Sequence, residues 1–169
     1  MTVVDGAGPM TLRGQSNPST SALEAFGRGL VAQRAGQVEE AIDAYRQAIR
    51  LNPALASAHR SLGRLQQLTG RAEDAVASYR RALALTPDDP DILTNLGLVL
   101  AATGQLDAAI ASHDRAVVIA PQKAATWLNR GTTLLATGRL EDAEASFERG
   151  VALDRWRPAT SAGASRGVL

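Results

Sequence analysis

Few residues of this 169-residue chain are of the types that carry out acid–base, nucleophilic or metal chemistry. The only two histidines, His59 and His113, have no acidic or cysteine neighbours at metal-ligand spacing, so structural roles are expected for both. Ser61 and Ser78 would need a base to act as nucleophiles, and none stands at a recognisable spacing. The glycines occur singly, without the pattern of a phosphate-binding loop. We therefore predict that the chain is not an enzyme and has no catalytic residues, no metal site and no cofactor.

The strongest pattern in the chain is a repeat of 34 residues. Glycines and prolines recur at this interval, as Gly36, Gly70, Gly104 and Gly138, and as Pro53, Pro87 and Pro121. A repeat of this length is typical of a small supersecondary unit that cannot bury its apolar face alone and must stack on a neighbour. Because stacked units create extended surfaces, the pattern favours a binding function.

Each repeat has the pattern of two helices joined at its glycine. In the first repeat, apolar residues fall at three- and four-residue steps, as Val38, Ala41, Ile42, Tyr45, Ala48 and Ile49. Ser21 and Glu24 have the spacing of a capping box and predict that the first helix begins there. We predict a flexible leader over residues 1–20, four repeats within 21–155 (about 22–55, 56–89, 90–123 and 124–155), and a short flexible tail over 156–169.

Small residues and rings also recur at fixed places in each repeat. The second repeat shows the set most fully, as Leu62, Gly63, Ala75, Tyr79, Ala82 and Pro87. This pattern resembles the tetratricopeptide repeat family, and Trp127 matches the family's tryptophan in the fourth repeat. The resemblance covers residues from about 22 to 155. It implies an all-α fold, a right-handed α-solenoid of stacked helix-turn-helix repeats, on a scaffold that binds proteins and has no chemistry common to its members.

The composition argues against several other classes of protein. The net charge is only +1, and charges of both signs alternate along the chain, so the basic stripe needed for nucleic acid is missing. No apolar run reaches the length of a membrane span, and the first residues lack the pattern of a secretory signal. We expect a cytoplasmic protein without membrane insertion, and the Ala- and Arg-rich composition is typical of bacteria.

The resemblance also implies where a partner binds. In this family the first helix of each repeat lines the concave side of the superhelix, where a peptide segment of a partner protein is held. Asn95 and Asn129 occupy the same place in consecutive repeats, so their carboxamides could grip a peptide backbone. The predicted groove is basic and polar at its N-terminal end and mainly apolar at its C-terminal end. Its predicted residues are Phe26, Arg60, Arg64, Asn95, Leu98, Leu128, Asn129 and Leu135.

Two alternatives to a peptide-binding adaptor remain open. The last helix has no covering helix after it in the sequence, so Phe147, Val151 and Trp156 are candidates for self-association or for packing in a larger complex. Glu144 stands where the other repeats carry Ile42, Val76 and Ile110, as expected for a terminal repeat with a polar outer face. The second alternative is that the chain is the N-terminal repeat module of a modular transferase.

Overall fold

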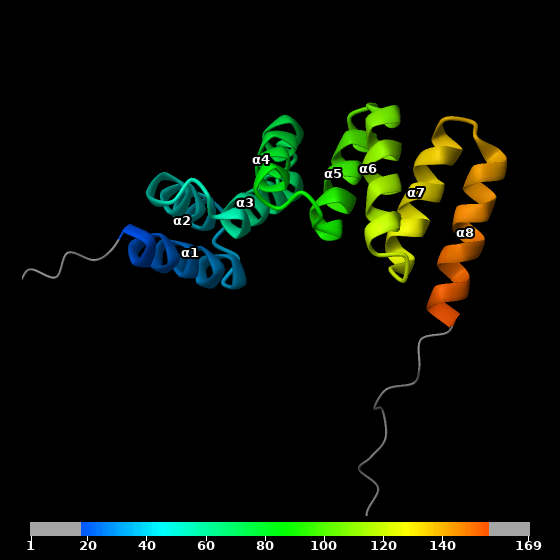
Figure 1. Ribbon diagram of the computed structural model, residues 1–169. Coiled ribbons are helices and arrows are strands. Elements are labelled where there is room, and N and C mark those ends of the chain that lie inside the picture. Colours follow the sequence, from blue (N-terminus) through cyan, green and yellow to red (C-terminus); the bar gives the residue numbers. More distant parts are fainter. Residues whose placement is uncertain (1–17, 156–169) are drawn as a thin grey trace, which may run out of the picture.

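The computed structural model describes residues 18–155, and within this range the chain forms eight helices and no strand. The helices are α1 (Pro18–Arg34), α2 (Val38–Leu51), α3 (Ala56–Leu68), α4 (Ala72–Leu85), α5 (Pro90–Ala102), α6 (Leu106–Ile119), α7 (Ala124–Ala136) and α8 (Leu140–Arg155). They follow one another as four pairs in a curved stack, with α1 at one end and α8 at the other (Figure 1). The predicted all-α fold of stacked helix pairs is confirmed.

The stack is held together almost entirely by neighbours in the sequence. Each helix packs most extensively on its pair partner, and the second helix of each repeat packs on the first helix of the next. In addition, α5 contacts α3 and α7, the first helices of the neighbouring repeats. The first helices therefore approach one another along one side, which makes that side the inner wall of the curved stack.

One predicted boundary is wrong. The helix α1 begins at Pro18, so Ser21 lies inside the first helix and does not cap it. Proline suits the first turn of a helix because its φ is fixed near the helical value and its missing N–H would have no intrahelical partner. The capping-box spacing of Ser21 and Glu24 was therefore a weaker start signal than the proline three residues earlier.

The turn between the two helices of each repeat requires glycine. Gly36, Gly70, Gly104 and Gly138 have φ between +74° and +76°, a left-handed conformation that side chains disfavour. The residue after each glycine donates its backbone N–H to the carbonyl five residues earlier, at 2.8 to 3.0 Å. This is the hydrogen-bond pattern of a Schellman cap, and it ends every first helix in the same way.

A pair of glycine substitutions tests this requirement. An added Cβ would contact nothing within 4 Å at either Gly70 or Gly27, but Gly70 has φ +74° whereas Gly27 lies inside the helix α1. We expect Gly70→Ala to lower the free energy of unfolding by about 1 kcal/mol, because alanine is strained in the left-handed region. Gly27→Ala should raise it by up to about 1 kcal/mol through helix propensity. Urea unfolding of both variants would contradict this account if the two changes had the same sign.

The core of each repeat is a ring on the second helix packed against a glycine on the first. A Cβ built at Gly29, Gly63, Gly97 or Gly131 would lie 2.5 to 2.9 Å from the facing ring, so only glycine lets the two helices approach this closely. The facing rings are Tyr45, Tyr79, His113 and Phe147. The first three of these side chains are completely buried, whereas Phe147 in the terminal repeat is partly exposed.

Candidate functional site

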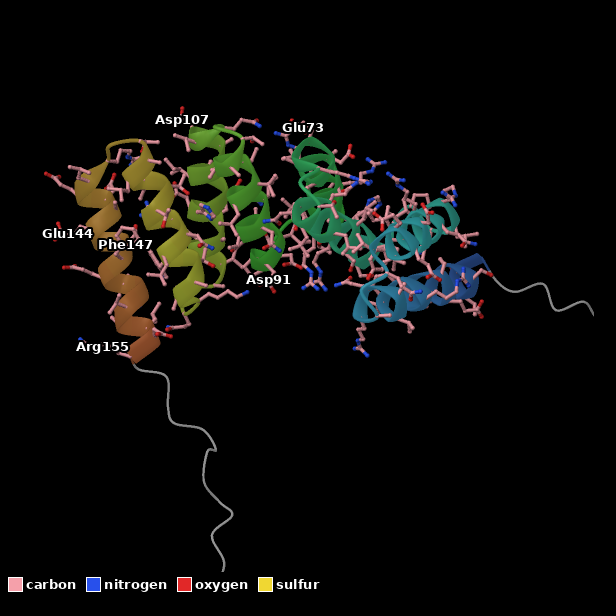
Figure 2. All side chains as sticks on the ribbon, turned by 180° about the vertical axis from the view of Figure 1, so that it is seen from behind. Glu73, Asp91, Asp107, Glu144, Phe147 and Arg155 are labelled. Atoms are coloured by element: carbon pink, nitrogen blue, oxygen red, sulfur yellow. The ribbon has the colours of Figure 1, made fainter. Side chains whose placement is uncertain are left out.

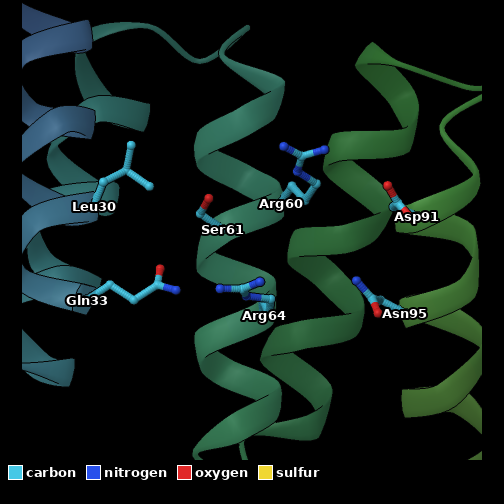
Figure 3. Close-up of a pocket in the computed structure, with 7 residues that line it drawn as sticks. All are labelled: Leu30, Gln33, Arg60, Ser61, Arg64, Asp91 and Asn95. Atoms are coloured by element: carbon cyan, nitrogen blue, oxygen red, sulfur yellow. The ribbon is translucent and has the colours of Figure 1, made fainter. Parts of the chain in front are cut away.

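An open pocket of about 490 Å³ lies on the inner wall between three successive first helices (Figure 3). Its lining side chains come from α1, α3 and α5, and they are Leu30, Gln33, Arg60, Ser61, Arg64, Asp91 and Asn95. Three of the predicted groove residues, Arg60, Arg64 and Asn95, are therefore brought together in one pocket. A ligand in this pocket would touch three repeats at once, which is the arrangement needed to hold an extended segment.

Two buried tyrosines fix polar side chains at this wall. The Tyr45 hydroxyl donates a hydrogen bond of 2.7 Å to Gln33 Oε1, and the Tyr79 hydroxyl donates one of 2.9 Å to Gln67 Oε1. Burial raises the pKa of Tyr79 to about 12, against the opposing effect of the nearby Arg64 charge. Burial also raises the pKa of Tyr45. Both tyrosines are therefore neutral at physiological pH and can donate a hydrogen bond. Side chains held in this way lose little conformational entropy when a ligand binds.

The charges around the pocket are mostly paired. Arg60 Nη1 lies 3.5 Å from Asp89 Oδ2, and Lys123 Nζ forms an ion pair with Asp91 Oδ1. Arg64 is exposed and forms no ion pair within residues 18–155. Figure 3 shows the Arg64 side chain between those of Gln33 and Asn95. The unmatched charge of the pocket is therefore positive, and it lies where a bound segment would pass.

The two predicted ladder residues, Asn95 on α5 and Asn129 on α7, are both half-buried. In the part of the chain that the structure describes, neither side chain makes a hydrogen bond. Asn95 lines the pocket, whereas Asn129 stands one repeat further along the same wall and does not line it. Both carboxamides are thus available to a ligand, each with donors and an acceptor.

The predicted apolar residues of the groove do not gather in this pocket. Phe26 packs on the Tyr45 ring with centroids 5.5 Å apart, and Leu128 lies against α8 beside Gly150. Leu98 is half-buried on α5 and does not line the pocket. Leu135 lies at the other end of the stack, in a second hollow. The pocket is consequently more polar than the predicted groove as a whole.

The second hollow, of about 440 Å³, is formed by the last repeat. We call it the α8 face, and it is lined by Leu135, Leu140, Ala143, Glu144, Phe147, Glu148 and Val151. It contains Phe147 and Val151, two of the three predicted self-association residues, while Trp156 lies outside the described residues. Figure 2 shows Phe147 and Glu144 on α8, at the outer end of the stack.

Sequence reasoning missed the residues that organise the charges of the pocket. The Asp89 carboxylate caps α5 by accepting hydrogen bonds from the backbone N–H groups of Asp91 and Ile92, at 2.9 and 3.1 Å. An aspartate immediately before a proline at the first helical position is a recognised start signal, so this cap could have been found. The ion pair between Asp91 and Lys123 links α5 to the N-terminal end of α7, and only the stacked geometry brings the two residues together.

The histidines have structural surroundings in the described part of the chain. His59 Nε2 lies 3.0 Å from the carbonyl oxygen of Pro53, and His113 is completely buried against Gly97. Within residues 18–155 no group of three His, Cys, Asp or Glu side chains is placed to hold a metal ion. None of the described helices is both long enough and apolar enough to span a membrane.

Comparisons with known proteins agree with this geometry. A family model described as tetratricopeptide repeat matches residues 26–90, 69–124 and 94–160. A crystal structure of MamA superimposes with a TM-score of 0.77 at 22% identity, covering 85% of this chain and 82% of that one. MamA from Desulfovibrio magneticus RS-1, residues 41 to the end, gives 0.77 at 18% identity, covering 82% and 78%. Pseudomonas aeruginosa PilF gives 0.71 at 24% identity, covering 82% of this chain and 63% of PilF. The TM-scores establish a shared fold, and no curated protein matches the chain significantly.

Proposed function

This chain belongs to the tetratricopeptide repeat family of protein-interaction scaffolds, and from that premise we propose that it is a non-enzymatic adaptor. In this proposal it holds a short, extended segment of a partner protein in the pocket between α1, α3 and α5. The segment carries an acidic side chain that pairs with Arg64. The observation that supports this choice most directly is the exposed and unpaired Arg64 at the centre of a pocket lined by three repeats.

Charge pairing within the pocket supports an acidic ligand. The acidic residue of the lining, Asp91, is already paired with Lys123, and Arg60 lies near Asp89. An incoming carboxylate therefore meets the free guanidinium of Arg64 with little opposing charge. An arginine can bind a carboxylate through two parallel hydrogen bonds, which adds geometric specificity to the charge attraction.

The two asparagines support an extended conformation of the ligand. Asn95 and Asn129 occupy equivalent places on α5 and α7, and a carboxamide can donate to a peptide carbonyl while accepting from a peptide N–H. Paired hydrogen bonds of this kind bind the backbone of a segment whatever its sequence. In the proposal, Arg64 selects for an acidic side chain and the asparagines fix the path of the chain.

A peptide-display selection on the wild-type protein tests this function. We expect the enriched peptides to contain an acidic residue at a constant position, and their binding to weaken as salt concentration rises. Arg64→Glu should weaken the binding of a selected peptide at least roughly 30-fold, since it replaces a charge-assisted hydrogen bond by repulsion. The double variant Asn95→Ala, Asn129→Ala should weaken it about tenfold through two lost hydrogen bonds. Fluorescence anisotropy with the labelled peptide gives these affinities.

Arg81→Glu is the matched control for the charge reversal. Arg81 is an exposed arginine on α4, the second helix of its repeat, and does not line the pocket. Arg81→Glu changes the net charge by as much as Arg64→Glu does. It should bind the peptide with the affinity of the wild type. Equal losses in the Arg64 and Arg81 variants would mean that net charge, and not this pocket, determines binding. Selected peptides without an acidic residue would reject the acidic ligand.

A further inference from the structure

The α8 face is a repeat-stacking surface on which no repeat packs within residues 18–155. Among the described helices, α8 packs substantially only on α7, whereas every other second helix also packs on the first helix of the following repeat. Val151 is 49% exposed, while Ile49, Leu83 and Val117 at the equivalent places of the earlier repeats are half-buried or buried. Leu140 is 63% exposed, while its equivalents Val38, Ala72 and Leu106 are half-buried. The surface therefore resembles the interface between two successive repeats, which we call an internal joint, and no first helix among residues 18–155 covers it.

The joint between α6 and α7 shows which contacts such a helix makes. Arg130 on α7 donates through Nε to Asp114 Oδ1 on α6 at 2.6 Å, and through Nη1 to Ser146 Oγ at 2.6 Å. The equivalent places in the α2–α3 joint are Arg46 and Leu62, which cannot form an ion pair. The α4–α5 joint likewise has Arg80 and Leu96. The cross-repeat ion pair is thus a specific feature of one internal joint.

The same two places in the first and last described helices carry complementary charges. One repeat length after Asp114 stands Glu148, on the α8 face. Three repeat lengths before Arg130 stands Arg28, on α1. Both residues are exposed, and neither forms an ion pair within residues 18–155. Val31, which is 68% exposed on α1, occupies the place at which Leu65 and Val99 are buried in internal joints.

We infer that the α8 face of one copy binds the outer side of α1 of a second copy, as though α1 were the first helix of a fifth repeat. Arg28 of one copy pairs with Glu148 of the other, as Arg130 pairs with Asp114 inside the chain. Val31 packs towards Phe147, as Leu65 packs with Tyr45 in the α2–α3 joint. The partner is a second copy because both halves of this charge pair belong to the same sequence.

The two different surfaces, the outer side of α1 and the α8 face, determine the kind of assembly that results. The contact joins two different surfaces, so each copy in a pair retains one free α1 side and one free α8 face. Such head-to-tail contacts produce a ring if the rotation between copies closes, and an open filament if it does not. Glu24 and Glu144 stand at places that are apolar in the α2–α3 and α4–α5 joints, which makes the contact weaker than those joints and reversible.

Sedimentation velocity on the full chain tests this assembly. We expect the weight-average mass of the wild type to rise with concentration beyond that of one copy. The single variants Arg28→Glu and Glu148→Arg should each associate at least roughly tenfold more weakly, because each sets like charges against each other. Mixing the two variants, or combining both changes in one chain, restores an opposite-charge pair at the contact and should restore association.

Two controls and three contrary outcomes decide the matter. Helicity and melting temperature should be close to those of the wild type in both single variants, since both residues are exposed and Arg28→Glu removes only one exposed hydrogen bond, from Arg28 Nη2 to Gln47 Oε1 at 2.9 Å. Arg64→Glu, the groove variant, should assemble as the wild type does, so loss of peptide binding and loss of assembly are separate outcomes. A wild type that keeps the mass of one copy at all concentrations would overturn the inference. Single variants that associate as tightly as the wild type, or a mixture that does not recover association, would also overturn it.

Discussion

Tyr79→Ala is expected to lower the free energy of unfolding by about 3–5 kcal/mol, a large fraction of the stability of a small domain. The Tyr79 side chain is completely buried and packs in the largest apolar cluster of the stack, with Val76, Ile92 and Leu96. Gly63 on the facing helix provides no side chain that could fill the space left by the ring. The loss of stability therefore has two parts. The variant no longer gains the free energy of burying the ring, and the space left by the ring remains as a cavity.

The position of Tyr79 also determines how the variant unfolds. Because each repeat contacts mainly its neighbours, the cluster around Tyr79 joins the first two repeats to the last two. Weakening it should separate the unfolding of the two halves, so that circular dichroism shows two transitions on heating where the wild type shows one. Phe147→Ala removes a ring at the equivalent place in the terminal repeat, where the ring is partly exposed. That variant should lose less stability and release only the α7–α8 pair.

Tyr79→Phe is the control for the hydroxyl. It keeps the ring and loses only the hydrogen bond to Gln67, so we expect a loss of about 0.5–1.5 kcal/mol. If Tyr79→Ala were no more destabilising than Tyr79→Phe, the ring would not be the principal contact of this repeat. If Tyr79→Ala and Phe147→Ala lost similar amounts of stability and each unfolded in a single transition, the stack would unfold as one unit. That result would contradict the view that each repeat is stabilised mainly by its neighbours.

Much of this fold could be predicted from the sequence because its determinants are local and repeated. The left-handed turn at Gly70 and the close contact between Gly63 and Tyr79 both depend on residue type at a fixed spacing. Each signal occurs in all four repeats, so chance resemblance is improbable. The start of α1 was predicted wrongly because it occurs once and has no repeated counterpart to support it.

The pocket could be predicted only in part, since its charges depend on contacts between each first helix and the start of the next first helix. The family resemblance placed Arg60, Arg64 and Asn95 on the inner wall, and the structure brings them together. Which of the charges remain free is decided by Lys123 and Asp89, through pairs that are formed across the stack. The partners of these pairs are 29 and 32 residues apart, and the helix pattern does not show that they are neighbours, so the sequence alone could not single out Arg64.

The replacement of a ring by His113 in the third repeat predicts a dependence of stability on pH. The imidazole is completely buried, and neither ring nitrogen has a hydrogen-bond partner in the described structure. Burial lowers the pKa of His113 to about 4; the Asp114 carboxylate opposes this shift and the Arg130 charge adds to it. The folded protein therefore holds His113 neutral at pH values at which the unfolded chain, with an ordinary histidine pKa near 6.5, takes up a proton.

The sign of the effect follows from this difference. Below a pH of about 6.5 the unfolded state gains a proton that the folded state does not, so stability falls as the pH falls towards 4. Between pH 7 and pH 5 the contribution of His113 should be a loss of about 2 kcal/mol. His113→Phe places the ring of the fourth repeat at the equivalent position, where Phe147 packs against Gly131 as His113 packs against Gly97. This variant should be more stable at pH 7 by about 1–3 kcal/mol, because no polar nitrogen is left buried without a partner.

Urea unfolding of the wild type and His113→Phe at pH 7 and pH 5 isolates the histidine. All carboxylates are common to both proteins, so the difference between their stabilities removes the carboxylate contribution to the pH dependence. We expect the advantage of the variant to grow by about 2 kcal/mol on going from pH 7 to pH 5. An advantage that stays constant with pH would mean that His113 accepts its proton in the folded state as readily as in the unfolded chain. The third repeat would then have to open around His113, and its core would not be the closed contact with Gly97.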